Sequence, residues 1–185
     1  MPGLNPIQPI MPVNLYDQLL DETKQLEELP VATGATFPPA TLVSVNGSGQ
    51  VQDYDTTIHN MALSQEGVKD IVNVEAGPQL FVASKSSAYV VLIKGKRLVM
   101  TASWTGGTPV ILDPTHIGQQ FEAAIDPLSG YTFIDLTTAG SGPFTILAVY
   151  EAPGLPEPFN TSLPNARRYN ARVVVEVDPA TVYVP

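Results

Sequence analysis

From residue 41 onward, the apolar residues come in short runs separated by Gly, Pro, Asn, Asp and Ser. Runs of about four to eight residues between such turn-forming residues predict β-strands. Residues 88–93 and 144–150 are almost continuously apolar, which is typical of central strands covered on both faces. The predicted strands lie near residues 41–45, 51–58, 68–74, 80–83, 88–93, 98–103, 109–112, 119–125, 131–136, 144–150, 172–177 and 181–184.

The turns between these runs have recognisable chemistry. Residues 46–49 read Asn-Gly-Ser-Gly, residues 126–130 read Asp-Pro-Leu-Ser-Gly, and residues 140–143 read Gly-Ser-Gly-Pro. Such segments reverse the chain between strands. Many short strands at a spacing of about 8–12 residues indicate an all-β antiparallel sandwich or a jelly-roll-like barrel. We therefore predict one β-sandwich domain over residues 41–185.

Residues 14–29 carry the one helical pattern in the chain. Asn14 can cap a first turn, and Leu15 and Leu19 share one side with further leucines. Pro30 would end the helix. The sequence predicts one short amphipathic helix, packed either on the β-region or on another subunit, and then a Gly/Thr/Pro linker over residues 31–40.

The first 13 residues contain four prolines with Leu4, Ile7, Ile10 and Met11 between them. Proline fixes φ and lacks an N–H donor, so this segment is expected to be extended. A disordered tail is the alternative interpretation. The regular apolar positions favour an arm that docks on a neighbouring subunit, within an N-terminal region of residues 1–40.

A second proline-rich segment covers residues 151–170 and predicts a long loop. Loops of about twenty residues inside a compact domain are usually functional or interfacial. This loop is therefore the second expected contact region, after the N-terminal arm. The candidate interface residues are Leu4, Ile7, Ile10, Met11, Leu15, Leu19, Pro156 and Phe159.

The amino-acid composition excludes some classes of binding partner and of structural site. Of the 185 residues, 15% are charged, against about 25% in typical domains, and the net charge is −9. This acidic balance argues against direct binding to nucleic acid, which needs Lys and Arg against phosphates. The chain has no cysteine, hence no disulfide and no thiolate metal site. We see no signal peptide and no apolar stretch of about 18 residues, so we expect a soluble protein without a membrane span, made in a cytoplasm.

Few residues suggest chemistry. Alternation over the strand predicted at 51–58 would place Asp53 and Asp55 on one face, near His59, but a metal site needs more ligands than these. His59 and His116 are the two histidines, and the sequence has no Gly-x-Ser-x-Gly elbow and no P-loop. Trp104 could stack on a sugar, or it could be partly buried in the core or in an interface. No catalytic residue, metal or cofactor is predicted.

The order of these segments resembles that of viral coat components. An extended arm (1–12), a many-stranded region (41–136) and closing strands (172–184) are similar in organisation to the β-sandwich decoration, or cement, proteins and the single jelly-roll capsid proteins of double-stranded DNA bacteriophages. The resemblance implies a non-enzymatic shell protein at the capsid surface of a virion. It also implies a homo-oligomer, with a trimer favoured, whose arm and loop contact a lattice of major capsid protein.

Other classes stay open. A single jelly-roll capsid subunit would need the same arms and strand edges. A carbohydrate- or protein-binding β-sandwich, such as a fibre head, would bind through groups near Trp104. An enzyme of an unrecognised β class is disfavoured by two histidines and no cysteine. For the shell interpretation we expect deletion of residues 1–13 to leave the domain folded and to abolish assembly.

Overall fold

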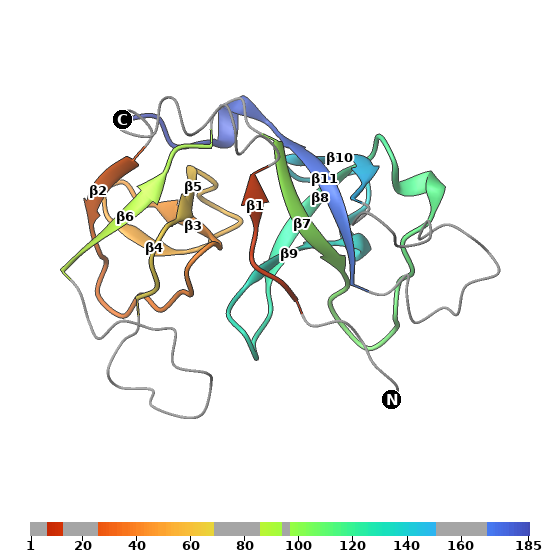
Figure 1. Cartoon of the computed structure of the whole chain (residues 1–185), viewed down its shortest axis with the longest axis horizontal. Helices are drawn as coiled ribbons and strands as arrows, with labels where there is room; N and C mark the ends of the chain where they lie inside the picture. The colour runs from red at the N-terminus through yellow and green to blue at the C-terminus, as the bar shows by residue number, and fades with distance from the viewer. Residues whose placement is uncertain (1–6, 13–25, 69–85, 94–96, 151–169) are drawn as a thin grey trace.

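The computed structural model describes residues 7–12, 26–68, 86–93, 97–150 and 170–185, and these residues form an all-β protein (Figure 1). Their only helical segments are three-residue 3-10 turns: η2 (Pro114–His116), η3 (Leu136–Thr138) and η5 (Pro179–Thr181). The strands gather in two sheets that lie side by side in Figure 1. The all-β prediction is confirmed, whereas a jelly-roll sandwich is not confirmed.

The first sheet closes into a five-stranded barrel, here called barrel A. Its order is β7–β11–β10–β8–β9, and β9 returns to β7 through a parallel pairing of Ala102 with Ile134 and Ser103 with Asp135. β1 adds to the free part of the same edge of β7, pairing Met11 with Val99. The strands are β1 (Met11–Pro12), β7 (Arg97–Ser103), β8 (Gln120–Ile125), β9 (Thr132–Asp135), β10 (Phe144–Val149) and β11 (Ala171–Val177).

The second sheet, sheet B, is antiparallel in the order β2–β6–β5–β3–β4. Val31, directly after β2, forms a parallel bridge with Val51 at the start of β4. The two edge strands of sheet B therefore meet at one point. Its strands are β2 (Leu26–Pro30), β3 (Leu42–Val45), β4 (Val51–Asp53), β5 (Met61–Ser64) and β6 (Ser87–Val91).

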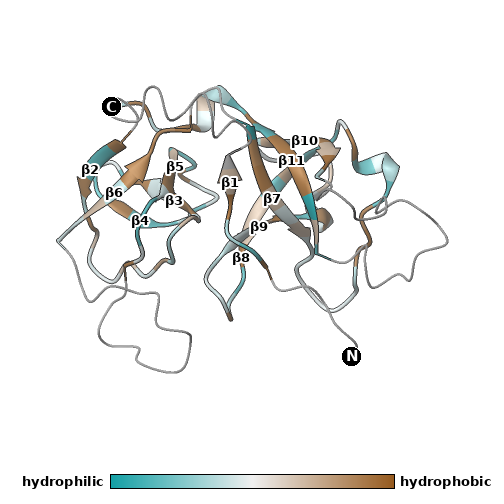
Figure 2. Cartoon of the chain, in the orientation of Figure 1, coloured by the Kyte–Doolittle hydropathy of each residue, from teal (hydrophilic) through white to brown (hydrophobic). Residues whose placement is uncertain are grey.

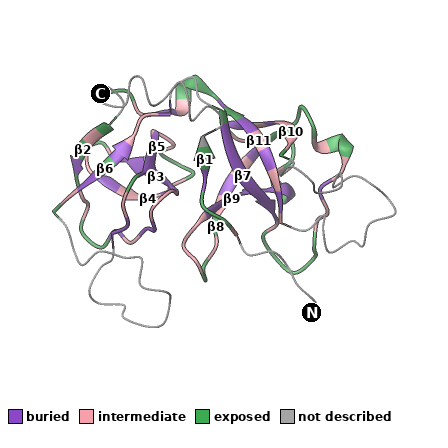
Figure 3. Cartoon of the chain, viewed as in Figure 1, coloured by how far each residue is buried: buried purple, intermediate pink, exposed green. Residues whose placement is uncertain are grey.

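Two apolar clusters form the core (Figures 2 and 3). The larger cluster holds the inward side chains of barrel A, such as Phe121 and Phe144, together with Leu42 and Met61 from sheet B. It therefore continues from the barrel into the junction of the two sheets. The smaller cluster belongs to sheet B and includes Phe37, which is 2% exposed.

Both ends of the described chain cross this junction. Near the N-terminus, the Ile10 N–H donates to the Ala40 carbonyl at 2.8 Å, although the next residue starts β1, which pairs with β7 of barrel A. After β11, the tail returns to sheet B, where the Tyr183 N–H donates to the Met61 carbonyl at 2.8 Å. Each sheet is thus completed by a segment from a distant part of the chain.

The predicted helix is wrong where the structure describes it. Residues 26–30 form strand β2, which pairs with β6 in a register that joins Leu29 with Ala88. Pro30 is tolerated because it ends an edge strand. Residues 14–25 lie outside the described residues. The segment predicted as a linker, 31–40, contributes the buried Ala35 and Phe37 to the core.

Most of the predicted strands after residue 87 are confirmed within one or two residues. The strand predicted at 51–58 ends at Asp53, because Asp55 closes a turn. Strand β5 was not predicted, and residues 109–112 and 181–184 form no strand. Of the predicted strand at 68–74, only Val68 is described, where it bridges Phe37. The predicted strand at 80–83 lies outside the described residues.

Candidate functional site

Asp55 and His59, two of the polar residues that sequence analysis singled out, lie in the turn between β4 and β5, at the junction of sheet B and barrel A. The Asp55 carboxylate accepts hydrogen bonds from the N–H of Thr57 at 2.8 Å and from its hydroxyl at 2.6 Å. His59 and Asn60 have φ of 53° and 22°, and the Asn60 side chain donates to the Val45 carbonyl at 2.7 Å. This strained turn directs His59 towards β8.

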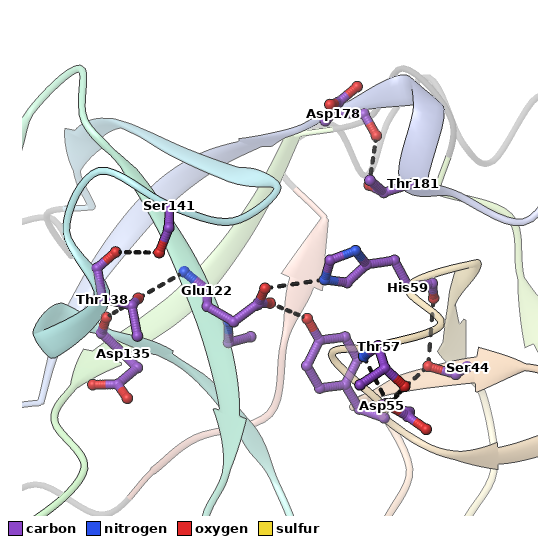
Figure 4. Close-up of polar contacts among 12 residues, drawn as sticks. Ser44, Asp55, Thr57, His59, Glu122, Asp135, Thr138, Ser141, Asp178 and Thr181 are labelled. Atoms are coloured by element: carbon purple, nitrogen blue, oxygen red, sulfur yellow. Dashed lines mark hydrogen bonds and ion pairs between the residues drawn. The ribbon is translucent and has the colours of Figure 1, made fainter.

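Glu122 of β8 is the centre of the site (Figure 4). Its Oε1 accepts a hydrogen bond from the Tyr54 hydroxyl at 2.5 Å and from the Ala123 N–H at 3.0 Å. Its Oε2 lies 3.0 Å from His59 Nε2. The carboxylate of one barrel strand therefore joins two side chains of sheet B.

The electrostatics favour a structural role for this group. Burial raises the pKa of the Tyr54 phenol, and the bond to Glu122 and its negative charge raise it further. The phenol therefore stays protonated and donates a hydrogen bond to Glu122. Oε1 accepts two hydrogen bonds and Oε2 faces His59, so the Glu122 carboxylate is held in one orientation. The arrangement holds the two sheets together.

A pocket of about 390 Å³ lies beside this group. One wall comes from sheet B and is mostly polar, and the other comes from β8 and is apolar. Burial raises the pKa of the Asp53 carboxyl there, against the effect of a hydrogen bond that it accepts from the Thr36 N–H at 3.0 Å. The pocket is lined by Gln52, Asp53, Tyr54, Asp55, Thr56, Ala123, Ala124 and Ile125.

The second candidate site is the place where the N-terminal segment binds, here called the arm seat and made of Ala40, Val99, Thr101 and Arg172. Ile10 is 2% exposed and packs in the larger core cluster. Its burial stabilises the docked segment by about 1.5–3 kcal/mol. Backbone pairing with Val99 and the bond to Ala40 fix the direction of the segment.

Arg172 holds the same segment by its charge. Its Nη1 donates to the Pro9 carbonyl at 2.8 Å, and its Nη2 donates to the Val99 carbonyl at 3.2 Å. The Nε is buried without a hydrogen-bond partner, and burial lowers the pKa of the guanidinium. Among the described residues no carboxylate pairs with Arg172, so main-chain carbonyls are the acceptors of this cation.

Some of the predicted interface residues lie among the described residues, and the others do not. Ile10 is buried in the chain's own core, whereas Met11 is 42% exposed and Ile7 is half-buried. The arm thus docks on its own chain in this structure, and contact with a neighbour stays a prediction. Trp104 is half-buried. The other predicted interface residues lie outside the described residues: Leu4, Leu15, Leu19, Pro156 and Phe159.

The predicted cluster of Asp53, Asp55 and His59 is not brought together around one point. Asp53 accepts from Thr36, Asp55 closes its own turn, and His59 contacts Glu122. Among the described residues, no group of three or more His, Cys, Asp and Glu side chains could hold a metal ion. Glu122 was missed because nothing in a half-apolar strand points to a partner 63 positions away in sequence.

Comparisons with protein-family models, with curated proteins and with solved structures found no match. Within the described part of the chain, no helix is long and apolar enough to span a bilayer.

Proposed function

We propose that this chain is a structural virion protein, a decoration or cement protein that stabilises a capsid through contacts of its arm and loops. The observation that carries the proposal is the arm seat. A proline-containing N-terminal segment is bound there as an added strand, through main-chain bonds and one apolar anchor, Ile10. Strand addition of this kind is a common way for one protein segment to bind another.

The junction group supports a scaffold over an enzyme. Tyr54 and His59 both contact the Glu122 carboxylate across the junction and hold it in one orientation. A shell component has to resist deformation rather than turn over a reactant. Side chains that tie two sheets together suit that task.

The hairpin between β8 and β9 offers a rigid contact point. Leu128 at its tip is 92% exposed. The Asp126 carboxylate accepts from the Ser129 N–H at 3.0 Å and from its hydroxyl at 2.5 Å, and the Gly130 N–H donates to the Asp126 carbonyl at 2.8 Å. An apolar side chain on a pre-organised turn loses little entropy on binding.

On this proposal the protein is located at the capsid surface and its partners are its own copies and the major capsid lattice. A trimer is the favoured oligomer. A single jelly-roll capsid subunit is the alternative within the same class. It would differ by forming closed shells without another protein.

Electron microscopy of the concentrated full chain tests the proposal. We expect discrete oligomeric rings or larger particles, with fewer of them for the Leu128→Ser chain than for a matched Ser141→Ala chain, since Ser141 is also exposed but is polar. Uniform particles of single-chain size at every concentration would contradict self-assembly. Closed shells of the chain alone would favour the capsid-subunit alternative.

The pocket beside Glu122 favours one second candidate, a carbohydrate-binding module. Carboxylates, an amide and a hydroxyl on one wall suit sugar hydroxyls, and the aliphatic wall of Ala123, Ala124 and Ile125 suits a sugar ring. A glycan array read with the full chain and with Asp53→Asn tests it. Glycan binding that is lost in the Asp53→Asn chain would support a carbohydrate-binding module. If the full chain binds no glycan, this candidate function is rejected.

A further inference from the structure

Within the part of the chain that the structure describes, the arm contacts residues far away in sequence. Ile10 bonds to Ala40, and Met11 pairs with Val99. The Gln8 N–H donates to the Thr101 hydroxyl at 3.2 Å, and Arg172 reaches Pro9. Each group of the arm seat lies at least 28 positions from the arm, so nothing in the seat requires the arm to come from the same chain.

The chain is also long enough to reach a neighbour. Thirteen residues, 13–25, separate the arm from β2. A segment of that length spans up to about 45 Å when extended. A globular domain of this size has a radius of gyration of about 16 Å. The connection can therefore bridge two molecules in contact.

We infer that the arm seat accepts residues 7–12 of a second copy of this chain, so that neighbouring subunits exchange their N-terminal strands. The inference rests on the proposed function and adds the partner of the arm and the place where it binds. Ile10 of one copy fills the core of the other, and Arg172 of the receiving copy holds the Pro9 carbonyl of the donor.

The exchanged and closed forms contain the same contacts, so protein concentration decides between them. A tethered arm has an effective concentration in the millimolar range at its own seat. Dilute protein is therefore closed. In an assembly, the seat of a neighbour is presented at a similar concentration, and exchange then links subunits without new contacts.

The absence of cysteine makes a direct test possible. Met11 and Val99 are Cα partners, and antiparallel partners lie about 4.5–5.5 Å apart, within the range for a disulfide. We would mix a Met11→Cys chain with a Val99→Cys chain at about 1 mM, oxidise the mixture and separate the products without reductant. We expect a mixed disulfide dimer at several times the level of dimer from either variant alone, and a lower yield as the mixture is diluted.

Two controls make a negative result decisive. The double variant Met11→Cys/Val99→Cys should close its disulfide within one chain when dilute, which proves that the pair can form. If the double variant closes and the mixture gives no more dimer than the single variants, strand exchange is overturned. If the double variant does not close, isotope-filtered NMR of a mixture of differently labelled wild-type chains replaces the disulfide test. Contacts of the Ile10 methyl groups between chains would support the inference, and contacts within one chain alone would overturn it.

The outcome separates this inference from the proposed function. Oligomers without the mixed disulfide would leave a shell protein whose arm stays on its own chain. A mixed disulfide without any higher assembly would support exchange and count against a shell role. An Arg172→Met substitution in the Val99→Cys chain should lower the yield of mixed dimer, because it removes the donor to Pro9 and leaves the Ile10 contact.

Discussion

Aspartate side chains close five of the turns in this protein, and their positions are visible in the sequence. Each accepts a hydrogen bond from the backbone N–H two residues later. Three of them precede a proline, a pairing that favours turn initiation. Local chemistry of this kind can be predicted because both partners lie in one short stretch. The residues are Asp55, Asp113, Asp126, Asp135 and Asp178.

These turns predict a loss of stability in acid. Bonds from the Thr115 hydroxyl and N–H hold the pKa of Asp113 below its ordinary value of 3.8, and bonds from Thr57 do the same for Asp55. A lowered folded pKa gives stabilisation that is complete above about pH 4 and is lost as the pH falls through the folded pKa. Urea unfolding measured from about pH 5 down to about pH 2.5, on either side of that pKa, should show this loss of stability.

An Asp113→Asn chain provides the comparison, because Asn can still cap the turn and does not titrate. It should lose less stability than the wild type over the same pH range. An unchanged acid dependence in Asp113→Asn would show that this turn is not a source of the effect.

The hydrogen bond between Tyr54 and Glu122 leads to a second prediction, about stability. Removing the Tyr54 hydroxyl takes a donor from a half-buried carboxylate, so Tyr54→Phe should lower the free energy of unfolding by about 1–3 kcal/mol. Tyr150→Phe is the matched control, since Tyr150 is 39% exposed. Urea titration of both chains measures the difference. Equal stabilities would mean that the Tyr54–Glu122 bond does not contribute.

At the scale of elements, local pattern predicted strands well where their neighbours in sequence are also their neighbours in space. β8 and β9 form such a hairpin, and both were predicted. β2 was not, because the leucine spacing of 26–29 suits a helix, whereas its partner β6 lies about sixty residues away. Tertiary pairing overrides local propensity in such a strand.

The close approach of the 140–143 turn to β8 gives an element-scale prediction. A Cβ on Gly142 would lie 2.3 Å from the Phe121 carbonyl oxygen, and the φ of Gly142 is 97°. Gly142→Ala should therefore lower the free energy of unfolding for two reasons. The left-handed backbone strain should cost about 1–2 kcal/mol, and displacement of the neighbouring backbone should cost a further amount of about 1–3 kcal/mol.

Gly140 is the matched control, with a φ of 88° and nothing within 4 Å of an added Cβ. Gly140→Ala should show the strain cost alone. Thermal unfolding of both variants measures the difference, and equal melting temperatures would contradict the close approach of the turn to β8.

At the scale of the whole molecule, the chain ends determine how the two sheets are joined. The sequence pattern of the arm predicted docking on a neighbouring subunit, and that contact stays a prediction, whereas Ile10 anchors the arm in its own chain. Its place in the core of its own chain could not be predicted, because the seat is assembled from residues 40 to 172. The pocket and Glu122 were hidden for the same reason. The partner of the protein is not encoded in any local motif.

Anchoring by Ile10 changes what deletion of the arm should do. Ile10→Ala should lower the free energy of unfolding by about 2–5 kcal/mol, since it leaves a cavity in the main cluster. Met11→Ala, at a residue that is 42% exposed, should have an effect within about 0.5 kcal/mol. Deletion of residues 1–13 is thus expected to weaken the domain as well as assembly. Equal effects of the two substitutions would contradict this account.

The most direct test of the proposed shell function is the absolute mass of the full chain by light scattering over a wide range of protein concentration. The chain has a mass of 19.8 kDa. We expect a mass that rises with protein concentration to that of a trimer or of larger particles. A mass of one chain throughout the range would contradict self-assembly.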